Sequence, residues 1–218
     1  MKTTFDHLVI GAADLRQGAD YVENLLGAKI AAGGKHPRMG THNLLARLGE
    51  TSFIEIIAID FEAVQPTQPR WFGLDDPQVR AALQQGPRLL TWVVACDDIT
   101  AALAAPEISF GTPQPLSRGE LRWYFGVPDD GRLLAGGILP YVISWQTESH
   151  PAAAMADIGL ELRLLRLHTP FVDWTARQLE AIGALEMVEL AEAPAATCPR
   201  FEAVLATPAG ERILASRS

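Results

Sequence analysis

A histidine and a glutamate on two separate apolar stretches are the residues of this chain best suited to chemistry. His7 lies within Phe5-Asp6-His7-Leu8-Val9-Ile10, and Glu55 lies within Phe53-Ile54-Glu55-Ile56-Ile57. A carboxylate buried among apolar residues is costly unless it is paired or bound to a cation. Two alternatives follow for the pair: His7 hydrogen-bonds Glu55, or both residues bind a divalent metal ion.

Four further residues are candidates for binding a substrate near this pair: His36, Asn43, Arg118 and Trp123. The Asn43 amide both donates and accepts hydrogen bonds, and the Arg118 guanidinium can clamp a carboxylate or a phosphate. Ordinary alternatives remain open for three of them. In these alternatives His36 only shapes a turn and Arg118 only belongs to a surface turn. Trp123, like Trp145, either lines an apolar pocket or packs in the core.

The elements that must position these residues begin with a strand at residues 5–10. Alternation predicts His7 on one face of this strand, with Phe5 and Val9, and Asp6 on the opposite face. Asp14 then caps a helix that ends at Gly27, since aspartate accepts the first free N–H groups and glycine suits the C-terminal cap. Three extended runs follow: Ala28 to about Gly33, Thr41 to Leu48, and Phe53 to Ile59.

This order of one strand, one helix and three strands returns near residues 89 and 160. A gapless overlay of the first two copies places Asp98 on Asp14, and in the third copy Thr169 is the predicted N-cap. We predict an α+β fold of tandem βαβββ modules. The predicted domains are residues 1–151, with modules at about 5–59 and 89–146 joined by linker 60–88, and a third module at 158–218. His150, in the following link, is predicted to be structural.

The bulk composition narrows the partners and the location. The chain has 218 residues, 48% of them hydrophobic, and a formal net charge of −8. That charge repels nucleic acid and anionic membranes. The sequence also contains no apolar run of about 18 residues, the length needed to cross a bilayer. Cys96 and Cys198 lack metal-type spacing, and we predict both to be buried thiols. We therefore expect a cytoplasmic protein with no nucleic-acid or membrane partner.

Six short motifs occur in an order that resembles the vicinal oxygen chelate superfamily, which includes glyoxalase I, extradiol dioxygenases and bleomycin-resistance proteins. The narrower resemblance is to its glyoxalase-like group. The motifs cover roughly residues 5–151: Asp6-His7-Leu8-Val9 with Asp14-Leu15, Gly34-Lys35-His36-Pro37, Gly40-Thr41-His42-Asn43, Phe53-Ile54-Glu55-Ile56-Ile57-Ala58, Ser117-Arg118 with Leu121-Arg122-Trp123, and Leu139-Pro140-Tyr141 with Trp145 and His150-Pro151.

The resemblance implies that two modules enclose a pocket, with a divalent metal held by the first and last strands of each module. His7 and Glu55 match those positions and would be metal ligands, for Zn²⁺, Fe²⁺, Mn²⁺ or Ni²⁺. Thr91 stands where a second histidine would lie, and the last strand of the second module, 139–145, has no acid. Either His36 or His42 could complete a three-ligand site, and a protein without cofactor is the other outcome.

The function implied is a metal-dependent lyase or isomerase that binds a small oxygenated molecule, with His7 and Glu55 as catalytic residues. The alternative is a metal-free binding protein that sequesters a small ligand, as resistance members of the superfamily do. An extradiol dioxygenase would need the histidine that Thr91 replaces.

The third module has no partner module within the chain. Its overlay on the first module places Leu162 at the position of His7, with Leu214 near the end of the last strand, so its concave face should be apolar and metal-free. An exposed apolar face is an association surface. We expect this face either to pack on the first two modules or, preferably, to form a homodimer.

Overall fold

The elements of the structure follow the predicted order. The computed structural model describes residues 2–27 and 29–216. The first unit comprises β1 (Thr3–Gly11), α1 (Leu15–Leu26), β2 (Ala31–His36), β3 (Thr41–Arg47) and β4 (Phe53–Ile59). After α2 (Pro77–Gln84), the second unit comprises β5 (Arg88–Cys96), α3 (Ile99–Ala104), β6 (Thr112–Arg118), β7 (Leu121–Val127), η1 (Leu134–Gly137) and β8 (Tyr141–Trp145). The third unit comprises η2 (Pro151–Ala154), β9 (Glu161–Thr169), α4 (Val172–Ala181), η3 (Leu185–Met187), β10 (Glu189–Glu192), β11 (Arg200–Thr207) and β12 (Gly210–Ala215). The α+β class and its βαβββ order are confirmed.

Of the predicted N-caps Asp14, Asp98 and Thr169, the first two are present. The Asp14 carboxylate accepts the Gln17 N–H at 2.8 Å, and Gly27 ends α1 with φ 69°. Asp98 likewise accepts the Ala101 N–H at 3.0 Å. The third prediction was wrong, because the N-cap of α4 is Phe171. Thr169 instead accepts the Phe171 N–H before the helix begins.

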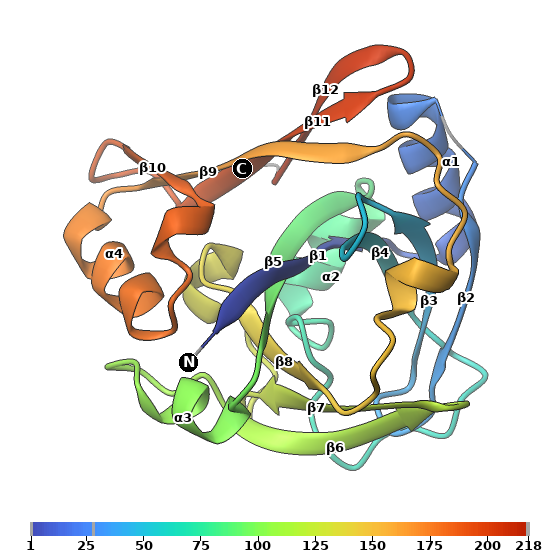
Figure 1. Cartoon of the computed structure of the whole chain (residues 1–218), viewed down its shortest axis with the longest axis horizontal. Coiled ribbons are helices and arrows are strands. Elements are labelled where there is room, and N and C mark those ends of the chain that lie inside the picture. Colours follow the sequence, from blue (N-terminus) through green and yellow to red (C-terminus); the bar gives the residue numbers. More distant parts are fainter. Residues whose placement is uncertain (1, 28, 217–218) are drawn as a thin grey trace.

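The first two units share one curled, eight-stranded sheet, in the order β2-β3-β4-β1-β5-β8-β7-β6 (Figure 1). In each unit the last strand lies parallel to the first, and β1 and β5 pair antiparallel at the centre of the sheet. The curl brings the edge strands β2 and β6 toward each other. Across this seam, Arg38 from the turn after β2 donates a hydrogen bond to the Pro115 carbonyl of β6 at 2.7 Å.

The third unit keeps the element order but not the strand order of the other two. Its four-stranded sheet runs β10-β9-β11-β12, so the strand that follows the helix pairs parallel with β9. In Figure 1 these orange and red strands lie across one side of the curled sheet. The third unit is therefore a plain βαβ crossover followed by a hairpin.

Strand alternation divides the curled sheet into two apolar faces. Val9, Ile57 and Val93 point to the inner, concave face. Their neighbours Leu8, Ile56 and Trp92 point to the outer face, where they pack with α1, α3 and the C-terminal sheet. The concave face can therefore line a pocket, while the outer face forms part of the main core.

The apolar face of the third unit is covered within the chain. Leu165, Leu167, Phe201 and Leu205 are all almost fully buried, in the same core as the outer face of the curled sheet. The Thr3 hydroxyl also donates to the Ile182 carbonyl at 2.7 Å. The first of the two expected outcomes is observed, and the exposed face that favoured a homodimer is not.

Two details of the sequence interpretation need correction. The second strand begins at Ala31 and continues through His36, so His36 is a strand residue ahead of the turn, whereas Ala28, where the strand was predicted to begin, lies outside the described residues. Cys96 is buried as predicted, but Cys198 is exposed, and both thiols are free.

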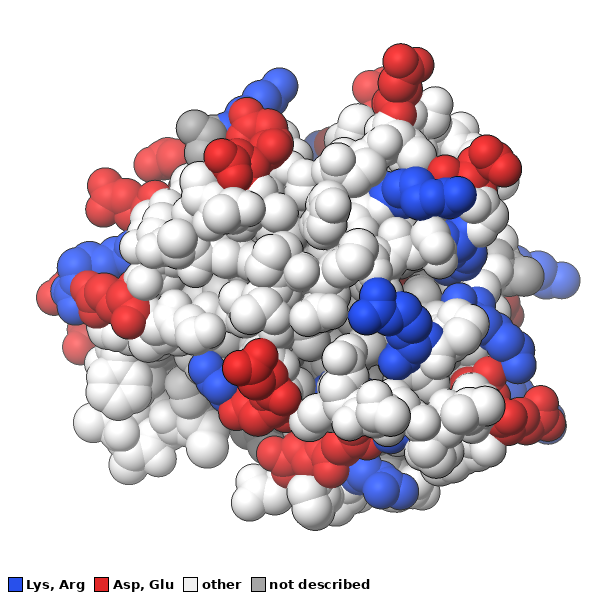
Figure 2. Space-filling view, turned by 90° about the horizontal axis from the view of Figure 1, so that it is seen from below, with Lys and Arg blue, Asp and Glu red and all other residues white. Residues whose placement is uncertain are grey.

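Figure 2 shows the molecule from below, on the side where β6 and β7 lie in Figure 1. Basic and acidic side chains are interspersed there around a broad uncharged area. Within residues 2–27 and 29–216, no helix combines the length and the apolar character needed to cross a bilayer.

Candidate functional site

A pocket opens on the concave face of the curled sheet, where the two units meet. All six residues predicted as site candidates line it: His7, His36, Asn43, Glu55, Arg118 and Trp123. They come from β1, β2, β3, β4, β6 and β7, so the curl of the sheet is what brings them together. Their roles remain predictions, but their convergence is observed.

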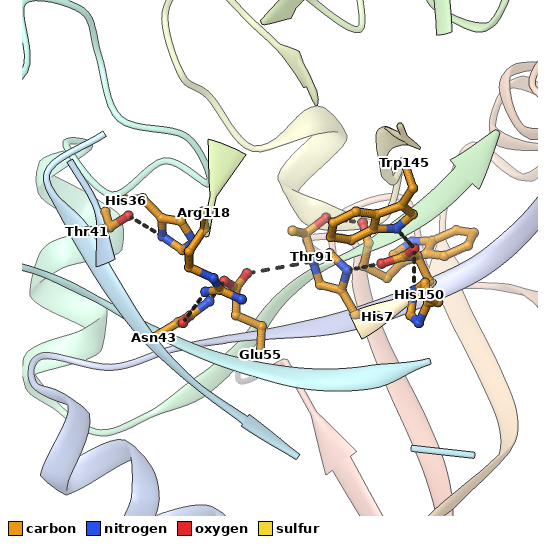
Figure 3. Close-up of polar contacts among 11 residues, drawn as sticks. His7, His36, Thr41, Asn43, Glu55, Thr91, Arg118, Trp145 and His150 are labelled. Atoms are coloured by element: carbon orange, nitrogen blue, oxygen red, sulfur yellow. Dashed lines mark hydrogen bonds and ion pairs between the residues drawn. The ribbon is translucent and has the colours of Figure 1, made fainter. Parts of the chain in front are cut away.

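His7 and Glu55 face each other at the base of this pocket, as predicted. His7 Nε2 lies 3.7 Å from Glu55 Oε2, and both side chains are almost fully buried. Figure 3 shows the two residues in a row of polar side chains, with Arg118, Asn43 and His36 gathered near Glu55 and Trp145 and His150 near His7. The separation exceeds a normal hydrogen bond, so an acceptor atom of a ligand could bind the Nε2–H better than Glu55 does.

Asp6 lies behind His7 and accepts from three side chains. Its Oδ1 is 2.5 Å from His7 Nδ1, while its Oδ2 accepts from Trp145 Nε1 at 2.7 Å. His150 Nε2 lies 3.1 Å from the same oxygen, and His150 Nδ1 accepts the Ala152 N–H, so the proton on Nε2 is directed at Asp6. His150 is thus structural, as predicted, and also part of the site.

Strict alternation had placed Asp6 on the face opposite His7, and that prediction was wrong. The pairing of β1 with β5 shifts register between Phe5 and His7, which makes Asp6 the extra residue of a β-bulge. A bulge turns its extra residue out of the alternation. The sequence carries no turn residue here that would reveal the shift, so Asp6 could not be recognised as a site residue.

Hydrogen bonding outweighs burial for both Asp6 and His7. Burial would raise the pKa of Asp6, but hydrogen bonds and charge from His150 and His7 lower it to about 2. Burial would lower the pKa of His7, but its hydrogen bond to Asp6 and the negative charges of Asp6 and Glu55 raise it to about 9. At neutral pH the base of the pocket therefore holds an imidazolium between two carboxylates.

Glu55 is ionised and held by an amide. Burial would raise its pKa, but His7, His36 and Asn43 together lower it. Asn43 Nδ2 donates to Glu55 Oε1 at 2.6 Å, and Asn43 Oδ1 accepts from Arg118 Nη1 at 3.2 Å and from the Gly34 N–H at 2.7 Å. Asn43 thus joins the carboxylate to the guanidinium. Arg118 comes from β6, so its link to Asn43 crosses the seam.

His36 is a neutral member of the site. Burial and the charge of Arg118 lower its pKa to about 4 even though Glu55 opposes this. Its Nδ1 lies 3.2 Å from the Thr41 hydroxyl, and its ring meets the edge of Trp71. His42, the alternative considered for a third metal ligand, alternates away from Asn43 on β3 and does not line the pocket.

Apart from Arg118, the second unit contributes aromatic and apolar groups to the pocket. Trp123 of β7 and Trp145 of β8 pack with ring centroids 5.5 Å apart, and Phe125 and Ile143 continue the same wall. Thr91, which stands where a second histidine was sought, is fully buried and lies within 3.4 Å of the Leu139 carbonyl. The first unit therefore supplies the histidines, Asn43 and Glu55, and the second unit supplies the aromatic wall together with Arg118.

Trp71 is a pocket residue that sequence reasoning missed. It comes from the connection between the units, where the next residue, Phe72, has φ 58°. The Phe72 N–H donates to the Tyr141 hydroxyl at 3.0 Å, which fixes this strained turn. The buried Trp71 Nε1 has no hydrogen-bond partner within the described chain. Nothing in a Pro-rich linker sequence signals that one of its tryptophans enters a pocket.

A resident metal does not fit the donors present. Of the donor atoms of His7 and Glu55, only Nε2 and Oε2 remain available, since Asp6 takes His7 Nδ1 and Asn43 takes Glu55 Oε1. In residues 2–27 and 29–216, no group of three or more His, Cys, Asp or Glu side chains converges so that it could hold a metal ion. A metal also needs a neutral imidazole, whereas both carboxylates favour the imidazolium of His7.

The chain resembles known proteins both in sequence and in structure. Residues 5–183 match the family model of the Glyoxalase-like domain. A hypothetical protein from Staphylococcus aureus has a similar structure, with 13% identity, a TM-score of 0.58, and coverage of 99% of this chain and 85% of that chain.

Two weaker structural matches are methylmalonyl-CoA epimerases. One, in complex with methylmalonyl-CoA and NH4+, gives 17% identity, a TM-score of 0.46, and coverage of 69% and 100%. The other, from Mycobacterium tuberculosis, gives 21%, 0.41, and coverage of 69% and 91%. No curated protein sequence matches the chain significantly.

Proposed function

Since this chain belongs to the glyoxalase-like domain family of the vicinal oxygen chelate superfamily, we propose that it binds a small oxygenated anion and transfers a proton next to a carbonyl group. The observation that carries this proposal is the buried His7–Glu55 pair with the Arg118 guanidinium beside it. The reaction class is that of an isomerase or a lyase.

The ligand's carboxylate would bind Arg118, which has one weak hydrogen bond, to Asn43, directed into the pocket. Its carbonyl oxygen would take the Nε2–H of His7, whose distance to Glu55 leaves that donor underused. Such a donor stabilises the negative charge that develops on the oxygen during enolisation. Asp6 holds the imidazolium in place through Nδ1.

Glu55 would be the base. The C–H bond next to the carbonyl breaks, the proton moves to Glu55 Oε2, and the electron pair forms the enolate. Once the ligand oxygen takes the His7 Nε2–H, Glu55 loses the contact that lowers its pKa, and its basicity rises. Return of the proton to carbon completes an isomerisation, and loss of a β-substituent completes an elimination.

No step is assigned to a metal, because no three His, Cys, Asp or Glu side chains of residues 2–27 and 29–216 converge so that they could hold one. Elemental analysis of protein purified without chelator tests this part of the proposal. We expect clearly less than one equivalent of Zn, Fe, Mn or Ni. Retention of one equivalent that is lost in Glu55→Gln would instead establish the metal site predicted from sequence.

The proton transfer is tested by exchange with solvent. Pyruvate and longer α-keto acids are incubated with the protein in deuterated water, and loss of the C–H signal next to the carbonyl is followed by proton NMR. We expect enzyme-dependent exchange that Glu55→Gln abolishes while the variant keeps its fold. Asp129→Asn, at an exposed turn, is the control and should exchange like the parent.

A binding protein without catalysis is the second candidate. The aromatic wall of Trp123, Phe125 and Trp145 favours it, because such a wall binds planar molecules without any chemistry. The same experiment separates the two functions. Saturable binding without exchange for any ligand that binds would support sequestration.

Oligomeric state and location complete the proposal. All six candidate residues line the pocket within a single chain, which supports a site that is complete in one chain, and a homodimer stays a prediction. Two free thiols, one of them exposed, favour a reducing compartment, which supports the cytoplasm as the proposed location.

A further inference from the structure

A second cavity adjoins the pocket and shares its wall. Leu45, Arg118 and Pro151 line both cavities. We call the second cavity the outer groove. Leu121, from the start of β7, lines its far side together with the segment Ala153 to Met155. Because Arg118 lies where the two cavities meet, a ligand held by this arginine has access to both.

The two cavities differ in size and in chemistry. The empty space of the pocket is about 430 Å³ including its mouth, and that of the outer groove, measured in the same way, is about 930 Å³. His7, His36 and Glu55 line only the pocket, whereas the outer groove has Arg118 and His150 in a lining that is otherwise mainly apolar, with Leu121 and Met155. The polar groups thus lie at one end of a longer, mostly apolar path.

We propose that the ligand has two parts: an acidic, oxygenated head in the pocket and an apolar alkyl or aryl tail in the outer groove, with the anionic group at Arg118. The position of the head rests on the proposed function above. The tail is argued from the three lining residues that the two cavities share and from the mainly apolar lining of the groove. Burying such a tail adds affinity in proportion to the apolar area removed from water.

The probes are α-keto acids of increasing length: pyruvate, α-ketobutyrate, α-ketohexanoate and α-ketooctanoate. Their dissociation constants are measured by calorimetry with the full chain. We expect affinity to rise by about four-fold for each added methylene group that enters the groove, which corresponds to ~0.8 kcal/mol per methylene. Pyruvate should bind weakly, because it fills the pocket alone.

Variants at the groove provide the decisive comparison. Ala154 is exposed on η2, so a tryptophan there fills the groove without replacing a core residue. We expect Ala154→Trp to weaken α-ketooctanoate binding at least ~10-fold and to leave pyruvate binding unchanged. Ala153→Trp is the second variant. Ala81→Trp, on the exposed side of α2 away from the groove, is the matched control and should change neither ligand.

The outcomes separate this proposal from the proposed function. Affinity independent of chain length, with Arg118→Ala still weakening every keto acid, would overturn the tail and leave the head. An Ala154→Trp variant that binds α-ketooctanoate like the parent would also overturn the tail. Binding of the whole series unaffected by Arg118→Ala, or no binding at all, would contradict the proposed function and the tail with it.

Discussion

Asp6 collects hydrogen bonds from Trp145 and the two histidines His7 and His150, and this convergence determines the charge of the site. A buried carboxylate with several donors stays ionised, and an ionised carboxylate beside His7 keeps the imidazole protonated. Glu55 adds a second negative charge on the other side of the ring. Each of these groups alone would be neutral at such burial, so the charge belongs to the cluster.

Replacing the Asp6 carboxylate should strongly lower the free energy of unfolding. Asp6→Asn keeps the shape but leaves the His7 charge with one carboxylate, and breaking a buried charge pair typically costs about 3–5 kcal/mol. We expect a loss of that size in the free energy of unfolding, measured by urea denaturation at neutral pH. Asp20→Asn, exposed on α1, is the control and should change it by less than ~0.5 kcal/mol. Equal stability of both variants would contradict the charge assignment.

The pH dependence of stability follows from the two shifted pKa values. His7 has a folded pKa of about 9 against 6.5 for the free group, so its contribution is present below pH 6.5 and is lost as the pH rises through 9. Asp6 has a folded pKa of about 2 against 3.8, so its contribution is present above pH 3.8 and is lost as the pH falls through 2. We expect the free energy of unfolding to be maximal between pH 3.8 and pH 6.5, where both contributions are present.

The measurement is the free energy of unfolding at intervals from about pH 4 to about pH 9. In the parent this free energy should fall between pH 6.5 and 9. In His7→Gln it should be lower at pH 6 and much flatter over that interval. A parallel fall in both proteins would assign the alkaline loss to other groups.

At the scale of elements, two edge strands supply groups that the seam brings together. Arg118 of β6 reaches Asn43 past Gly34 of β2, where an added Cβ would lie 2.6 Å from Arg118 Cδ. Glycine at this position leaves room for the arginine. The polar half of the site therefore depends on the close approach of two strands that are distant in the sequence.

Gly34→Ala tests this dependence. The extra methyl group should displace the flexible Arg118 side chain and leave the strands in place, so we expect about 10-fold weaker binding of anionic ligands with little change in thermal stability. In the Arg118→Ala background the same substitution should have almost no effect, because the displaced group is already gone. A full additional loss in the double variant would show that Gly34 acts on something else.

Features that depend on local sequence could be predicted, whereas features that depend on strand pairing or on contacts distant along the chain could not. Capping by Asp14 and Asp98 and the inward position of His7 and Glu55 follow from local sequence, and the structure confirms them. The bulge at Asp6 arises from pairing between β1 and β5, which no local pattern reports. Trp71 enters the pocket because of contacts far away along the chain, at Tyr141, and the strand order of the third unit likewise depends on tertiary packing.

At the scale of the whole molecule, the third unit covers the outer face of the curled sheet. Its buried residues Leu167 and Phe201 share one core with Trp92 and Ile138 of the second unit. Gly49 N–H also donates to the Leu160 carbonyl at 3.0 Å. The division into a domain at 1–151 and a separate module remains a prediction, and the shared core argues that the two depend on each other for stability.

Truncation tests that dependence. A chain ending at Ser149 would expose the apolar outer face and would also lose the His150 contact to Asp6, so we expect it to aggregate or to lose its tertiary structure. Near-ultraviolet circular dichroism and sedimentation velocity are the measurements. A soluble, folded fragment would contradict the shared core. The sedimentation of the full chain at micromolar concentration tests the homodimer, which a single-chain mass would contradict.

The seam between β2 and β6 has a consequence for ligand binding. It is held at Arg118 by a side-chain contact rather than by a strand ladder, and the guanidinium that contacts Asn43 is also the group proposed to bind the ligand's anion. An anion bound as proposed would compete with Asn43 for Arg118, so occupancy of the site would weaken this contact across the seam. In that binding mode, the ligands that hold Arg118 most strongly would also loosen this contact most.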